Sequence, residues 1–313
     1  MNATCRVAMW LATVCWAAVC LAMPSALALS RLRADDETAV QPQPTLHDKA
    51  SVLGFTPQSL AAEGKLVIVG GGEATEEIND EFMRLAGGEN ARVVLIPAFP
   101  YETPEEVQEL IEDWKKYSMA SITILDAKSR EEADTLDFVL PLKKATGVWL
   151  CGGVQAHLAN LYNGTRTEIE LRKVLDRGGV IGGTSAGASF MSRVMIHDGT
   201  HKNADLADGL GLVQRAVIDQ HFTQRGRHTR LIGVLDDHPE LIGIGVDENT
   251  ALVVRGNHLR VIGESKVTIF LTPDEDEAVK IYRLKHDEEA RLEFVATDVQ
   301  FNTPRIQMRR VRN

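Results

Sequence analysis

The chain has 313 residues, of which 44% are hydrophobic and 25% are charged. That length allows one large domain or two small ones, and the composition excludes a collagen, a low-complexity chain and a protein with many membrane spans. The net charge of −10, from 34 basic and 44 acidic residues, argues against non-specific binding to nucleic acids, because phosphate contacts need clustered Lys and Arg.

The first 28 residues have the pattern of a secretory signal peptide. Arg6 is their only charged residue, an apolar run covers residues 7–23, and the small residues that end at Ala28 offer a cleavage site. The alternative is an uncleaved anchor, but the apolar run is short for a membrane-spanning helix. We therefore expect an exported protein, periplasmic or extracellular, with no stable membrane insertion after cleavage.

Three of the four cysteines, Cys5, Cys15 and Cys20, lie in this segment. Cleavage after Ala28 would leave Cys151 alone, so we expect the exported chain to fold without an internal disulfide. Residues 29–60 combine mixed polar residues with several prolines and are predicted to form a linker.

Short apolar strands alternate with helical patterns from Lys65 onward. Strands are predicted at 66–69, 92–96, 121–125, 147–150 and 179–182, and helices at 75–85, 104–117, 130–139, from 155, and at 165–175. Strands that are apolar throughout are typical of a parallel sheet covered on both faces. Residues 61–265 are therefore expected to form an α/β domain with a mostly parallel sheet and helices on both faces.

The pattern becomes β-rich after about residue 215. Residues 251–254 and 259–262 flank a loop of turn-forming residues, which predicts a β-hairpin. Further strands are predicted at 266–271, 278–284 and 291–296. We interpret residues 266–313 as a β-rich C-terminal extension.

Residues 183–187, Gly-Thr-Ser-Ala-Gly, fit the G-x-S-x-G pattern of a nucleophile elbow. They follow a predicted strand and precede residues that can continue as a helix. This context would place Ser185 at the carboxyl end of the sheet, where ligands bind in α/β folds. Ser185 is thus a candidate nucleophile, and the alternative is a glycine-rich turn with a capping serine.

A serine nucleophile needs a base, and usually an acid that orients the base. His221 stands at the end of an apolar stretch and is the candidate base. Asp247 and Glu248 also follow an apolar stretch, and they would point to opposite faces of an extended segment. The pattern alone leaves the choice of acid open.

His197 and His201 are four residues apart, which is a ligand spacing on a helix. Gly199 lies between them in a loop-like run, so we predict no metal site there. We expect no cofactor.

Five ordered segments resemble the cyanophycinase family of serine peptidases, relatives of aspartyl dipeptidase E with a fold like that of class I glutamine amidotransferases. The segments span roughly residues 64–263 and are 66–72 with its glycine triplet, 147–155, 183–188, 218–231 and 243–251. The resemblance implies a triad of Ser185, His221 and Glu248, and so selects Glu248 over Asp247. The triad would then follow the chain order Ser, His, Glu. In α/β-hydrolases the acid precedes the histidine, so the order argues against that superfamily.

The resemblance also implies a substrate pocket and an oxyanion hole. The backbone N–H groups of Gly153 and Ala186 are the candidate oxyanion donors, because paired glycines let a backbone approach closely. Guanidinium groups of the pocket can pair with substrate carboxylates, and Asp219 could receive a substrate guanidinium. The alternative is an internal ion-pair network that supports the loop that starts at His221, called the histidine loop below. The polar residues that match the family's pocket are Gln155, Asp219, Gln220, Arg225, Arg227 and Arg230.

The family substrate is cyanophycin, a poly-aspartate backbone with arginine on each β-carboxyl, and the family product is a β-aspartyl-arginine dipeptide. The expected partner is therefore a peptide or a cyanophycin-like polymer, and a homodimer is expected from the resemblance alone. Two residues depart from the family pattern: Val154 stands where Asn or Asp is usual, and Cys151 replaces Thr. The other hypotheses are a related serine peptidase for other aspartyl peptides and a non-catalytic polymer-binding protein of the same fold.

Overall fold

The computed structural model describes residue 60 and residues 64–99, 103–112, 114–200, 203–272, 279–295 and 305–311. The predicted signal peptide and all of the predicted linker except Leu60 lie outside these residues. In the described part of the chain, no helix has both the length and the apolar character needed to cross a membrane.

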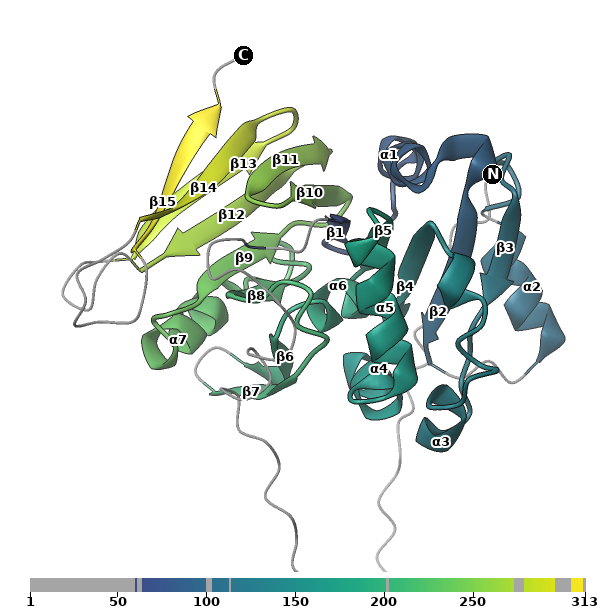
Figure 1. Ribbon diagram of the computed structural model, residues 1–313. Coiled ribbons are helices and arrows are strands. Elements are labelled where there is room, and N and C mark those ends of the chain that lie inside the picture. The colour runs from purple at the N-terminus through teal and green to yellow at the C-terminus, as the bar shows by residue number, and fades with distance from the viewer. Residues whose placement is uncertain are drawn as a thin grey trace, which may run out of the picture. The chain divides into compact units, whose positions relative to one another are not determined.

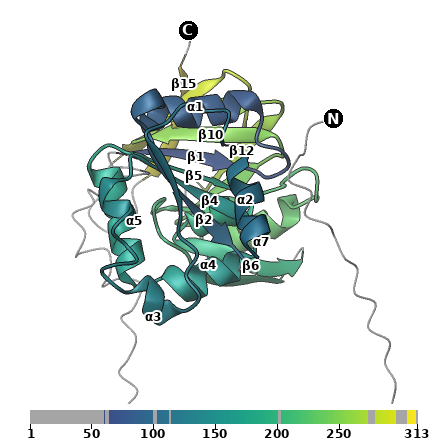
Figure 2. The ribbon, with the colours of Figure 1, turned by 90° about the vertical axis from the view of Figure 1, so that its right-hand side faces the viewer.

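A nine-stranded sheet forms the main scaffold, in the strand order β15-β14-β11-β10-β1-β5-β4-β2-β3. Figure 2 shows β10, β1, β5, β4 and β2 side by side in this order. The parallel strands are β1 (Lys65–Val69), β5 (Val180–Thr184), β4 (Gly147–Gly153), β2 (Arg92–Ala98) and β3 (Ser121–Ile124). The antiparallel strands that extend the sheet are β10 (Thr250–Arg255), β11 (His258–Gly263), β14 (Glu289–Val295) and β15 (Arg305–Val311).

Helices cover both faces of the parallel strands, as predicted. Alternate side chains of β1 enter different cores, because successive residues of a strand point to opposite faces. Val67 lies in the core that holds Phe82, whereas Leu66 lies in the core that holds Leu158 and Leu171. The first face is covered by α1 (Glu76–Ala86) and α2 (Pro104–Glu112), and the second by α4 (Gln155–Tyr162), α5 (Arg166–Asp176) and α6 (Ala186–Phe190).

A second, four-stranded sheet has the order β13-β12-β9-β8 (Figure 1). Its strands are β8 (Ala216–Asp219), β9 (Ile242–Val246), β12 (Lys266–Leu271) and β13 (Lys280–Lys285). One face shares an apolar core with the nine-stranded sheet, and α7 (His228–Asp237) packs on the other. Because β8 and β9 are parallel neighbours, the residues that follow them meet at one edge. A two-stranded hairpin, β6 (Val194–Thr200) and β7 (Asn203–Asp208), completes the strands.

The structure confirms the α/β architecture and the hairpin at 251–262, but two predicted helices are shorter. The helix predicted at 130–139 is only α3 (Arg130–Ala133). Thr135 Oγ1 donates to the Glu132 carbonyl and accepts from the Phe138 N–H, so its side chain replaces helical backbone bonds. The helix predicted at 104–117 ends at Glu112, and Trp114 lies in the core against Phe82 and Trp149. Short 3₁₀ turns lie at Gly88–Asn90 and Leu142–Lys144. The strands β6, β7 and β15 were not predicted.

Candidate active site

Ser185 lies between the end of β5 and the start of α6, where the G-x-S-x-G pattern predicted it. Its φ of 50° and ψ of −111° are rare for a residue other than glycine, and a strained turn is typical of a nucleophile elbow. Glycine is required beside it: a Cβ on Gly187 would lie 2.2 Å from the Leu150 carbonyl oxygen. The local sequence therefore closes a tight turn that holds the serine at the carboxyl end of the sheet.

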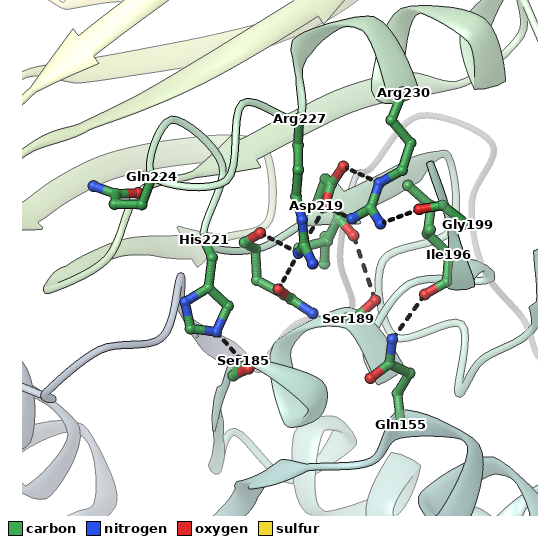
Figure 3. Close-up of polar contacts among 12 residues, drawn as sticks. Gln155, Ser185, Ser189, Ile196, Gly199, Asp219, His221, Gln224, Arg227 and Arg230 are labelled. Atoms are coloured by element: carbon green, nitrogen blue, oxygen red, sulfur yellow. Dashed lines mark hydrogen bonds and ion pairs between the residues drawn. The ribbon is translucent and has the colours of Figure 1, made fainter. Parts of the chain in front are cut away.

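The structure brings Ser185, His221 and Glu248 together. Ser185 Oγ lies 2.8 Å from His221 Nε2, and His221 Nδ1 lies 2.5 Å from Glu248 Oε1. Figure 3 shows the His221 ring turned toward Ser185. His221 follows β8 and Glu248 follows β9, so the parallel pairing of these two strands places the carboxylate at the imidazole. Asp247 instead contacts Thr223, Ser265 and Lys266.

The hydrogen bonds fix the protonation of the imidazole. Because a carboxylate only accepts, Nδ1 must carry the proton that Glu248 receives, and Nε2 is left to accept from Ser185. Burial lowers the pKa of His221, and the positive charges of Arg225 and Arg227 lower it further, against the opposing effect of Glu248. A lowered pKa favours the neutral ring at pH 7, which is the form that a base needs.

A glycine triplet after β1 shapes the space around the imidazole. The backbone N–H of His221 donates to the Gly70 carbonyl at 2.6 Å. A Cβ on Gly71, whose φ is +97°, would lie 2.2 Å from His221 Cε1, and a Cβ on Gly72 would lie 3.0 Å from Glu248 Cβ. In the sequence the triplet only contributed to the resemblance, because a contact with residues some 150 to 180 positions away leaves no local signal.

Asp219, at the end of β8, is 1% exposed and pairs with two guanidinium groups. Arg230 donates to both carboxylate oxygens, and Arg227 Nη1 lies 3.3 Å from Oδ1 (Figure 3). Arg227 also donates to the backbone and side-chain oxygens of Gln220. Burial raises the pKa of Asp219 against the effect of both arginines, and lowers that of Arg227 to about 10. These contacts favour the internal network that supports the histidine loop.

Gln155 and Arg225 differ from these network residues. Gln155 Nε2 donates to the carbonyls of Ile196, at 3.2 Å, and His197, at 2.8 Å. Since both partners are acceptors, the amide orientation is fixed and Oε1 is left as an acceptor. Arg225 is exposed, and no described residue forms an ion pair with it.

The glycine pair at the end of β4 borders the serine through its first member. A Cβ on Gly152 would lie 3.5 Å from Ser185 Cβ, whereas one on Gly153 would meet the Phe99 ring at 2.4 Å. Ala186 begins α6 and is buried, and the first N–H groups of a helix have no intrahelical partner. Both oxyanion donors, Gly153 and Ala186, stay predictions.

The two positions that depart from the family pattern lie beside this glycine pair. Cys151 is a buried thiol in β4. Val154 is 52% exposed and stands at the N-cap of α4, where it makes no capping hydrogen bond.

The two histidines considered as metal ligands do not share a helix. His197 lies in β6, and His201 lies outside the described residues. Within the described residues, one group of three potential ligands gathers, made of the exposed Glu77, His286 and Asp287.

Comparisons with known proteins identify the family of this chain. Residues 66–262 match Peptidase family S51. The cyanophycinase of Geminocystis herdmanii is 32% identical over 215 residues, which are 65% of this chain and 79% of the relative. That of Synechococcus elongatus is 32% identical over 252 residues, 74% and 78% of the two chains, and that of a Nostoc species is 34% identical over 226 residues, 68% and 75%.

A crystal structure of a peptidase from an acI-B1 Actinobacterium matches the fold with a TM-score of 0.60 at 23% identity, covering 74% of this chain and 97% of that one. The family match covers more than half of the chain and includes the segments that carry Ser185, His221 and Glu248. This chain therefore belongs to peptidase family S51 and is a serine-type peptidase.

Proposed function

We propose that the protein is an exported peptidase that hydrolyses cyanophycin to β-aspartyl-arginine dipeptides, with Ser185, His221 and Glu248 as its catalytic triad. The observation that carries the proposal is the hydrogen-bond chain from Ser185 Oγ through the imidazole to Glu248 Oε1. The substrate is inferred from the cyanophycinases that are 32–34% identical to this chain.

In the first step, neutral His221 accepts the proton of Ser185 Oγ as the oxygen attacks the scissile carbonyl carbon. Glu248 holds Nδ1–H and stabilises the imidazolium that forms. The carbonyl oxygen becomes negative, and the N–H groups of Ala186 and Gly153 are the proposed donors to it. One such donor contributes about 3 kcal/mol of transition-state stabilisation.

In the second step, the imidazolium returns the proton to the leaving amine and an acyl-enzyme remains on Ser185. Water then attacks the ester, with His221 again as the base. The reaction consumes one water for each peptide bond, and the triad returns to its starting protonation.

The polar residues around the triad suit a zwitterionic arginyl branch. Exposed Arg225 can pair with the branch carboxylate, as guanidinium groups do, and Gln155 Oε1 can accept from the branch guanidinium. Asp219, Arg227 and Arg230 would then support the histidine loop instead of touching substrate.

Export rests on the first 28 residues, with their single charge and apolar run. N-terminal sequencing of the protein purified from the periplasm or the medium should give a chain that begins at Leu29. A full-length chain that stays with the cytoplasmic fraction would contradict export. It would not test the proposed catalytic mechanism.

Three incubations separate the proposed activity from its alternatives. The purified protein is mixed with insoluble cyanophycin, with β-aspartyl dipeptides, or with a serine-directed fluorophosphonate, and turbidity, released amines and covalent labelling are measured. Clearing of cyanophycin together with labelling is the expected result. Labelling with cleavage of dipeptides only would favour another aspartyl peptidase, and tight binding to polymer of unchanged length would favour a non-catalytic protein.

A further inference from the structure

Asp247 is a buried carboxylate next to Glu248 that the proposed chemistry does not use. Its side chain is 1% exposed. Oδ1 accepts the backbone N–H of Thr223 at 3.0 Å, and Oδ2 accepts the Ser265 hydroxyl at 2.8 Å and pairs with Lys266 Nζ at 3.2 Å. Every contact of this carboxylate is therefore to a donor, as an ionised group requires.

These partners come from two segments that are distant in the chain. Thr223 belongs to the loop that starts at His221, whereas Ser265 and Lys266 lie at the start of β12. Asp247 itself follows β9, so one carboxylate joins the histidine loop to two strands of the four-stranded sheet. Burial alone would raise the pKa of Asp247, but the hydrogen bonds from Thr223, Ser265 and Lys266 outweigh it and lower the pKa.

The histidine loop needs such an anchor because His221 has a φ of +49°. A left-handed conformation is costly for a residue other than glycine and persists only where its surroundings impose it. The loop is held on both sides of that residue: the His221 N–H donates to Gly70, and the Thr223 N–H donates to Asp247.

The same anchor orients the catalytic acid. Glu248 is the next residue and lies in the turn that follows β9, so the contacts that fix Asp247 to Thr223 and Lys266 also fix the backbone from which Glu248 reaches the imidazole. Glu248 is otherwise lightly held, since its side chain is 34% exposed and its N–H donates to the exposed Gln224 at 3.1 Å.

We propose that Asp247, held by Lys266, is a positioning residue that keeps His221 and Glu248 in register with Ser185. The inference rests on the proposed role of the triad, and Asp247 itself touches no reacting atom.

The test uses the full chain with Asp247→Asn, which still offers Thr223 an acceptor but puts an NH₂ group toward Ser265 and Lys266. A displacement of about 1 Å can cost on the order of 100-fold in rate, so the rate constant for fluorophosphonate labelling of Ser185 should fall by about that factor. With cyanophycin, kcat should fall while KM stays near its wild-type value. The downfield NMR signal of the His221 Nδ1 proton should shift.

Two further variants keep the test decisive. Lys266→Met removes only the ion pair and should give a smaller loss of labelling, which provides a readout if Asp247→Asn does not fold. Glu81→Gln is the matched control, because this carboxylate is 11% exposed and pairs with Arg84 and Arg260. Its labelling rate should equal that of the wild type.

The inference is overturned if folded Asp247→Asn labels at the wild-type rate and keeps the His221 signal. A wild-type chain that the phosphonate does not label would instead contradict the proposed triad. A chain that labels but does not cleave cyanophycin would contradict only the proposed substrate.

Discussion

Ser185 Oγ and His221 Nε2 lie 2.8 Å apart although the two residues follow strands of different sheets. Ser185 follows β5 of the nine-stranded sheet, and His221 lies beyond β8 of the four-stranded sheet. The apolar core that the two sheets share therefore sets the distance between nucleophile and base. Changes that shift this packing should lower activity before they unfold the protein.

Replacing Ser185 with alanine should abolish turnover, because the variant lacks the hydroxyl that is proposed to form the acyl-enzyme. Loss of a triad serine costs on the order of 10⁶-fold in kcat. The matched control is Ser189→Ala, which removes a serine of α6 whose hydroxyl donates to the Ile218 carbonyl at 3.5 Å. Initial rates on cyanophycin should separate the two variants, and comparable losses in both would contradict the assignment.

The activity should fall as the pH is lowered, because protonated His221 cannot accept the serine proton. Burial lowers the pKa of His221, so the acid limb of kcat/KM should have its midpoint below the usual histidine value of about 6.5. Labelling of Ser185 by the phosphonate should follow the same limb. A midpoint at or above that value would show that another group controls the rate.

Removing the charge of Arg225 should move this acid limb to higher pH. The guanidinium lowers the pKa of His221, so Arg225→Gln stabilises the protonated ring. The labelling rate is the suitable measurement, because Arg225 is also a proposed substrate contact and would change KM. Arg309→Gln, at a side chain that is 78% exposed, should leave the midpoint unchanged.

A methyl group at Gly71 should disable the triad. Both Gly71 (φ +97°) and Gly88 (φ +57°) are left-handed, so alanine at either should cost about 1–2 kcal/mol of stability. Only at Gly71 would the new Cβ meet the His221 ring, at 2.2 Å, because nothing lies within 4 Å at Gly88. Urea unfolding and labelling rates measured together should show a stability loss without a rate loss for Gly88→Ala, and a larger stability loss together with a rate loss for Gly71→Ala.

Val154→Asn should stabilise the protein. The valine occupies the N-cap of α4 without a capping bond, and its 52% exposure means that little core packing is lost. An asparagine cap is worth about 1 kcal/mol over an apolar residue. Thr75→Ala should have the opposite effect, because Thr75 Oγ1 accepts the Ile78 N–H at the N-cap of α1. Urea midpoints that move in the same direction for both variants would contradict this prediction.

The sequence was informative where structure is local. The apolar strands, the turn at Ser185 and the hairpin of β10 and β11 depend on neighbouring residues, and all were predicted. The length of α3 was not, because Thr135 replaces helical bonds with its side chain, and this cannot be distinguished from an ordinary helical threonine in the sequence.

The contacts between distant segments could not be predicted. Asp247 and Glu248 both follow an apolar stretch, so the sequence pattern does not distinguish them as the acid. The pairing of β9 with β8 and β12 brings Glu248 to the imidazole and Asp247 to Lys266. Similarly, the burial of Asp219 between Arg227 and Arg230 depends on where α7 packs. The family resemblance selected Glu248 as the candidate acid. It also placed Arg227 and Arg230, which pair with Asp219, in the substrate pocket together with the exposed Arg225.

The most direct test of the central claim is mass spectrometry of the products formed from cyanophycin by the wild-type chain and by Ser185→Ala. The account predicts release of β-aspartyl-arginine dipeptides by the wild type, and intact polymer with the variant. Dipeptide release by both chains, or none by a wild-type chain that is folded and cleaved after Ala28, would contradict it.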